Sequence, residues 1–210
     1  AHANGLAEEV LTLKVANYCK EELEKYDGVK VIMTRTGAEC PNPLPGSYSS
    51  AKDIRQRVQK AVQQGADVIV SFHFNSSGSG SANGAEVIYQ NQSYDAAIGL
   101  ESKALAEKIQ KELVALGLKD RGIYSKDSTD GSHDPNGVKD DYWTLHNEAK
   151  ALGKPAVLIE HAFVSGNVDS ANLKKESYLK QLGIADAKGI INQYGLLNGT
   201  SQKEPGVGKI

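Results

Sequence analysis

The sequence has little cysteine and almost no imbalance of charge. Only two cysteines, Cys19 and Cys40, occur among 210 residues. A disulfide framework and a cysteine-rich zinc knuckle are therefore excluded, and only a single bridge between the two remains open. Lysine and arginine number 24 against 26 acidic residues, which gives a formal net charge of −2. This balance provides no strong basic field for holding nucleic acid or an anionic membrane surface.

Long apolar segments are also missing. The longest runs, over 66–70 and 155–159, are far too short to cross a bilayer, so no transmembrane segment is expected. No signal peptide is visible at the start of the sequence, so export is not indicated by targeting, although a signal could have been removed. Hydrophobic residues make up 40% and charged residues 24% of the chain, which is typical of a globular domain. The length favours one such domain.

Helix-like and strand-like patterns alternate along the chain. Helices are expected over 8–25, 52–64, 96–116, 142–152 and a last segment to about 194, and strands over 29–34, 66–74, 84–90 and 155–163. The proline-containing stretch 38–50 and the polar stretch 119–141 read as irregular. The alternation predicts an α/β fold with a twisted, mostly parallel sheet and helices on both faces. We expect one domain over 1–196, followed by a tail or linker over 197–210.

Ionisable side chains stand where two of the predicted strands end. His73 closes the strand 66–74, and Glu160 closes the apolar run of the strand 155–163. Ligands of such sheets gather outside the carboxyl ends of the strands. Glu8 lies one turn before Leu11 on the apolar stripe of the first helix and therefore points toward the core side. The structural alternatives are a hydrogen-bonded histidine beneath a loop, an exposed glutamate just past the strand, and a carboxylate placed against a helix dipole.

These residue types suit a catalytic zinc site. Zinc takes nitrogen and oxygen ligands and, in catalytic sites, leaves one position for water. The bound water becomes acidic, and an unligated carboxylate nearby can act as general base and acid. The separations from Glu8 to His73 and from His73 to Glu160 are long and contain no local motif, so the spacing alone does not identify such a site.

Four segments, taken in order, resemble the zinc-dependent N-acetylmuramoyl-L-alanine amidases, a family of bacterial cell-wall hydrolases and sporulation amidases. They are GLAEEVLTLKVA at 5–16, VIMTR at 31–35, VSFHFNSS at 70–77 followed by NGAEVIY at 83–89, and PAVLIEHAFVSGN at 155–167. The resemblance extends over roughly residues 3–195. It implies zinc-dependent cleavage of the amide between N-acetylmuramic acid and the L-alanine of the peptidoglycan stem peptide.

The resemblance also implies roles for individual residues. Glu8 and His73 would be metal ligands, and Glu160 would be the catalytic glutamate. Arg57 and Asn75 match common family residues, and we interpret them as supports of a helix surface and a loop.

One departure from the family concerns the third ligand. The family begins with a strand ending in Gly-His-Gly, whose histidine is the first zinc ligand, and no such segment occurs here. The third ligand is therefore expected upstream of Ala1, and the missing strand would leave a gap in the sheet with exposed backbone edges. His2 is a weak substitute, because it lies too close to Glu8 in the sequence.

The remaining histidines are weaker candidates. His161 follows Glu160 directly and must face the other side of the sheet. His133 and His146 are expected to be exposed, and Tyr142 and Trp143 are expected to pack on the sheet rather than stack on sugar.

Two other functions stay open. One is a module that binds peptidoglycan without cleaving it, because its metal site is incomplete. The other is a different zinc amide hydrolase, a peptidase or a deacetylase. The family's substrate lies outside the cytoplasmic membrane, so the resemblance implies an exported, cell-wall protein. The stem-peptide preference and the oligomeric state do not follow from the sequence.

Overall fold

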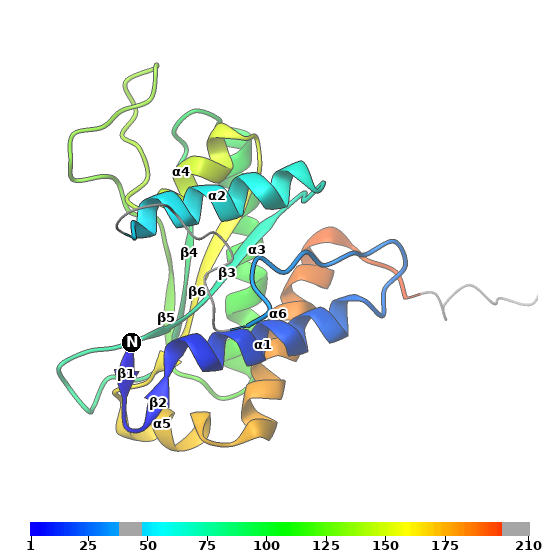
Figure 1. The fold of residues 1–210 in the computed structure, drawn as a ribbon, viewed down its shortest axis with the longest axis vertical. Coiled ribbons are helices and arrows are strands. Elements are labelled where there is room, and N and C mark those ends of the chain that lie inside the picture. Colours follow the sequence, from blue (N-terminus) through cyan, green and yellow to red (C-terminus); the bar gives the residue numbers. More distant parts are fainter. Residues whose placement is uncertain (38–47, 199–210) are drawn as a thin grey trace, which may run out of the picture.

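The computed structural model describes residues 1–37 and 48–198. A mixed four-stranded sheet in the order β3-β6-β4-β5 forms its centre (Figure 1). Its strands are β3 (Ile69–Asn75), β4 (Ala85–Tyr89), β5 (Asp120–Tyr124) and β6 (Ala156–Phe163). β3 pairs with β6 and β4 with β5 in parallel, whereas β4 and β6 are antiparallel. Two of the three pairings are thus parallel, as the alternating pattern predicts.

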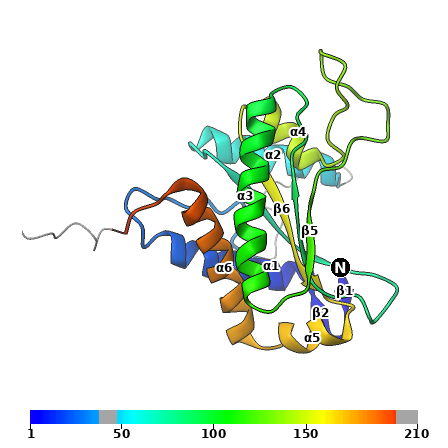
Figure 2. The same ribbon diagram turned by 180° about the vertical axis from the view of Figure 1, so that it is seen from behind.

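Helices cover both faces of this sheet. They are α1 (Glu8–Leu23), α2 (Ser50–Gln63), α3 (Ala96–Ala115), α4 (Thr144–Ala151), α5 (Asn167–Leu173) and α6 (Glu176–Tyr194). α3 runs lengthwise along the sheet and packs against α6, which in turn packs against α1 (Figure 2). α2 and α4 pack on each other and cover the other face. A short hairpin of β1 (His2–Ala3) and β2 (Leu6–Ala7) precedes α1.

Helix patterns in the sequence account for the core. In α1 the predicted stripe is buried and includes Leu11, Val15 and Cys19. α3 begins at Asp95, whose carboxylate accepts the backbone N–H groups of Ala97 and Ile98. Three leucine and isoleucine side chains spaced by four residues on α3 are fully buried (Leu105, Ile109, Leu113). Burying these apolar faces between helices and sheet is the main driving force for the fold.

Two glycines on α6 allow its close packing. A Cβ atom on Gly183 would lie 2.5 Å from the carbonyl oxygen of Val15 in α1. A Cβ atom on Gly189 would lie 2.6 Å from the Cα atom of Ile109 in α3. Both distances are shorter than a real side chain tolerates, so α6 can sit between α1 and α3 only because these positions lack a side chain.

Several expected boundaries are wrong. Residues 29–34 are not a strand: within the described part of the chain no neighbouring strand pairs with them. β5 lies inside the stretch 119–141, which was expected to be irregular throughout. Asp169 lies within α5. Its carboxylate accepts the N–H groups of Gly84 and Phe163 and ties β6 to the start of β4.

β3 is an edge strand among the described residues, and a groove of about 990 Å³ lies along its unpaired side. Its lining includes apolar side chains, among them Val29, Val31, Val68 and Val70, and charged side chains, among them Arg35, Asp53 and Arg57. The groove ends at Glu8, His73 and Glu160. No helix of the described residues has the length and apolar character needed to traverse a bilayer. Cys19 is buried, while Cys40 and most of the stretch 38–50 fall outside the described residues.

Candidate active site

Glu8 and His73 meet at the end of the groove. Glu8 opens α1, and its Oε1 atom lies 3.1 Å from the Nδ1 atom of His73 on β3. The same oxygen accepts the backbone N–H of Phe74 at 3.2 Å, and Oε2 pairs with the amino group of Ala1. Burial opposes ionisation of Glu8, but the hydrogen bonds from His73, Ala1 and Phe74 outweigh it and lower the pKa of the carboxyl to about 2.

The Nε2 atom of His73 is also held in place. It lies 2.9 Å from the hydroxyl of Ser71, two residues back on the same face of β3. One ring nitrogen thus faces Glu8 while the other has an orienting partner, an arrangement that metal-binding histidines need. Sequence alternation along β3 predicts this shared face of Ser71 and His73.

Glu160 lies beside His73 in the sheet. The two residues are register partners in the parallel pair β3–β6, so their side chains leave the same face. The Oε2 atom of Glu160 is buried and has no hydrogen-bond partner among the described residues. Burial raises the pKa of this carboxyl to about 7, with the charge of Glu8 adding to the effect and His73 opposing it. A carboxyl in this range can both accept and return a proton near neutral pH.

These donors fit part of a zinc site. Two ligands bound at 2.0–2.1 Å in tetrahedral geometry lie about 3.3 Å apart, close to the 3.1 Å between Glu8 Oε1 and His73 Nδ1. The carboxylate oxygen and the imidazole nitrogen are both ligand types that zinc accepts. Across residues 1–37 and 48–198, however, no three His, Cys, Asp or Glu side chains gather where they could hold a metal ion. The described residues therefore bring together two donors of the ligand type, whereas a catalytic zinc site takes three protein ligands.

His2 is not placed to complete the set. Its Nε2 atom lies 2.8 Å from both carboxylate oxygens of Glu9, and both side chains are largely exposed. Arg57 pairs with the buried Asp53 one turn earlier on α2, through contacts of 2.8 and 2.9 Å, and it also lines the groove. Asn75 accepts the N–H of Ser76, as expected of a loop-fixing residue.

The other histidines follow the predictions only in part. His161 faces away from Glu160 and is fully buried against Phe72 and Phe74, as the alternation requires. Its Nε2 atom pairs with Asp186 of α6 at 2.8 Å, and Nδ1 lies 3.0 Å from the carbonyl oxygen of His73. Burial alone would lower the pKa of His161, but the Asp186 carboxylate raises it. This pair fixes the backbone beneath His73.

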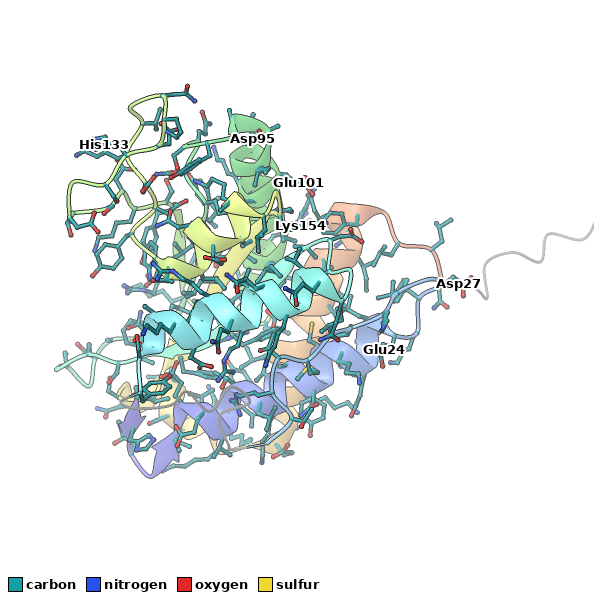
Figure 3. The ribbon with its side chains drawn as sticks, turned by 45° about the horizontal axis from the view of Figure 1, so that its top comes forward. Glu24, Asp27, Asp95, Glu101, His133 and Lys154 are labelled. Carbon is teal, nitrogen blue, oxygen red and sulfur yellow. The ribbon has the colours of Figure 1, made fainter. Side chains whose placement is uncertain are left out.

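His133 and His146 differ from each other. His133 is exposed on the loop between β5 and α4, which projects away from the sheet (Figure 3). His146 was expected to be exposed but is fully buried, because the Trp143 ring packs on it and α4 turns it inward. Burial lowers its pKa to about 3. Tyr142 was expected to pack on the sheet but is 47% exposed, and Lys126 lies over its ring at 3.7 Å.

Sequence reasoning missed Glu86 and Arg121. Glu86 on β4 pairs with Glu160 across the antiparallel ladder. Its carboxylate accepts hydrogen bonds from Asn75 Nδ2 at 3.0 Å and from Arg121 Nε at 2.7 Å. An acidic residue inside the strand-like run AEVIY is the one signal that pointed to it, because burying a carboxylate requires a partner.

Comparisons with known proteins identify the family of the chain. Residues 1–192 match the protein family described as N-acetylmuramoyl-L-alanine amidase. The chain is 30% identical over 196 residues to the N-acetylmuramoyl-L-alanine amidase LytC of Bacillus subtilis, covering 92% of this chain but only 32% of LytC. It is 29% identical to the endolysin of Bacillus phage SPP1, of which it spans 59%. The chain therefore spans about a third of the length of LytC and somewhat over half of the length of the endolysin.

Solved structures show the same fold. The catalytic domain of CwlV, an N-acetylmuramoyl-L-alanine amidase from Bacillus (Paenibacillus) polymyxa, superposes with a TM-score of 0.66 and 27% identity, over 90% of this chain and 86% of that one. Cwp6 from Clostridium difficile gives a TM-score of 0.69 and 28% identity, over 92% of this chain and 26% of that one.

Proposed function

Because the chain belongs to the N-acetylmuramoyl-L-alanine amidase family, we propose that it hydrolyses the amide between N-acetylmuramic acid and L-alanine in peptidoglycan. The observation that carries the proposal is the convergence of Glu8, His73 and Glu160 at the end of one groove. The convergence brings two ligand-type donors next to a buried carboxyl with an unpartnered oxygen. The substrate further implies action at the cell wall, outside the cytoplasmic membrane.

Glu8 and His73 would hold zinc. When bound, zinc would supply the positive charge that acidifies a water molecule and polarises the scissile carbonyl. Glu160 takes the proton of the attacking water and returns it to the nitrogen of L-alanine as the amide bond breaks. Its Oε2 atom has no hydrogen-bond partner among the described residues and is therefore available to take the proton. Ser71 keeps the ring of His73 in a fixed orientation.

The third ligand is proposed to come from a β-strand that occupies the groove. Among the described residues β3 offers an unpaired edge there, and apolar side chains such as Val68 and Val70 form part of the lining. A strand seated against β3 would run toward Glu8 and His73 and could present a histidine beside them. This proposal predicts that the metal affinity of the site depends on the occupant of the groove.

Two measurements test the proposed activity. Digestion of purified peptidoglycan should release L-alanine amino termini and free lactyl groups of muramic acid. The E160Q variant should lose this turnover and keep its zinc, as measured by elemental analysis of the purified protein. An active E160Q variant would contradict the assignment of Glu160. Release of other amino termini or of acetate would instead identify a peptidase or a deacetylase, and binding of peptidoglycan without any release would identify a binding module.

A further inference from the structure

A row of polar side chains crosses one face of the sheet. His73 on β3 and Glu86 on β4 both pair with Glu160 on β6, so all three side chains leave the same face. Arg121 on the outer strand β5 continues the row, since its Nε atom donates to the Oε2 atom of Glu86 at 2.7 Å. The row therefore runs from a ligand-type histidine, past two carboxyls, to a guanidinium.

Within the side chain of Arg121, only the Nε atom forms a hydrogen bond with another described residue. Its Nε atom uses the Glu86 carboxylate, and its guanidinium lies 4.8 Å from the centre of the Phe163 ring. Asn75 and Tyr124 donate to the other carboxylate oxygen, which fixes Glu86 in turn. No hydrogen bond between described residues uses the terminal Nη atoms of Arg121, and the side chain is 33% exposed. These donors are therefore available to an acceptor from outside the chain.

The distance between Glu160 on β6 and Arg121 on β5 corresponds to the length of a short peptide. β5 is two strands away from β6, or about 10 Å at the usual spacing, and the side chain reaches back toward Glu86 on the strand between them. Two extended residues span about 7 Å. A substrate with its scissile amide at Glu160 and its peptide directed toward β5 would therefore bring the residue after L-alanine to the guanidinium.

We propose that Arg121 binds a carboxylate on the residue that follows L-alanine in the substrate. A guanidinium recognises a carboxylate through paired N–H groups, and its open Nη atoms are the ones that such pairing uses. Glu86 acts as a positioning residue that holds the guanidinium through Nε. The inference rests on the proposed amidase function, and it adds a specificity for acidic peptides to that function.

The test compares two small substrates. One is N-acetylmuramoyl-L-alanyl-D-glutamic acid, and the other is the same compound with both glutamyl carboxylates converted to carboxamides. We expect the zinc-loaded protein to show a KM for the acid at least about tenfold lower than for the diamide, the fold-change expected for a charge-assisted hydrogen bond. The R121Q/E86Q variant, which leaves no unpaired buried charge, should lower the ratio of the KM for the diamide to the KM for the acid to about one. The K103Q variant, which removes an exposed cation on α3, should keep it.

Binding to the E160Q protein separates this inference from the proposed function. Calorimetric titration with both compounds needs no turnover, and it should show the same preference for the acid, abolished by adding R121Q/E86Q. Thermal unfolding of each variant checks that it is folded. Equal binding of acid and diamide by E160Q, or a preference that survives R121Q/E86Q, would overturn the role of Arg121. Failure of the unsubstituted protein to hydrolyse either compound while elemental analysis shows bound zinc, with the binding preference intact, would overturn the amidase function alone.

Discussion

Burial of Glu160 should make the metal-free protein less stable as the pH rises. The pKa of this carboxyl is raised from 4.5 to about 7 in the folded chain. The unfolded chain releases the proton near 4.5, whereas the folded chain keeps it up to about 7. The folded state therefore binds more protons between these values, and the free energy of unfolding falls as the pH rises through this window.

The size of this effect follows from the pKa change. At 1.36 kcal/mol for each pKa unit, the change corresponds to about 3 kcal/mol of stability that is present below pH 4.5 and absent above pH 7. The E160Q variant cannot ionise, so it should not lose this contribution. Relative to the unsubstituted protein, E160Q should gain up to about 3 kcal/mol between pH 4.5 and pH 8.

Urea denaturation in the presence of a chelator measures the difference. The free energy of unfolding is determined from pH 4.5 to pH 8 for the unsubstituted protein, for E160Q and for E107Q, which makes the same chemical change at an exposed position on α3. E107Q should follow the unsubstituted protein across the range. If the curves of E160Q and the unsubstituted protein ran parallel, the carboxyl of Glu160 would have an ordinary pKa, and its proposed proton-transfer role would lose its electrostatic basis.

Three further predictions concern the supports of the site and the core. E8Q and H73A should each lower zinc affinity in competition with a chromogenic chelator, because each removes one of the two described donors; unchanged affinity would exclude that residue as a ligand. D186A leaves His161 buried without its partner and should cost about 3–5 kcal/mol in urea denaturation, and a cost below about 1 kcal/mol would contradict the buried pair. G183A forces a methyl group against the carbonyl oxygen of Val15 and should cost about 1–3 kcal/mol, whereas a stabilised G183A variant would show that α1 and α6 are not in close contact.

Local patterns in the sequence predicted where Glu8, His73 and Glu160 lie, whereas the roles proposed for them came from the family resemblance. The period of two along β3 separates His73 from Phe72 and Phe74, and the end of an apolar run marks Glu160. The stripe of α1 places Glu8 on the inward side. Each of these features depends on neighbours within a few positions, which is the range over which periodicity carries information.

Features that depend on distant contacts escaped prediction. β5 is short, charged and contains Gly122, so only its pairing with β4 makes it a strand. Arg121 consequently remained in a stretch expected to be irregular, and the one signal for Glu86, an acidic residue in a strand-like run, did not identify its partner. His146 was expected to be exposed because α4 is short, but its burial depends on packing by Trp143. Residues 29–34 have the composition of a strand, yet strand formation needs a partner, which composition does not report.

The alternation along β6 has a consequence for how the protein tolerates change. Glu160 leaves one face of the strand, and the adjacent His161 leaves the other, where it is sealed in by Phe72, Phe74 and Asp186. Adding or deleting a single residue between Ala156 and Ile159 would exchange the faces of these two side chains. The carboxyl of Glu160 would then enter the apolar core, and the imidazole of His161 would face the groove. Adjacent residues of one strand thus serve the proposed chemistry and the core, so we expect an insertion or deletion there to abolish activity and folding together. The projecting loop before α4, in contrast, can change length at little cost in stability.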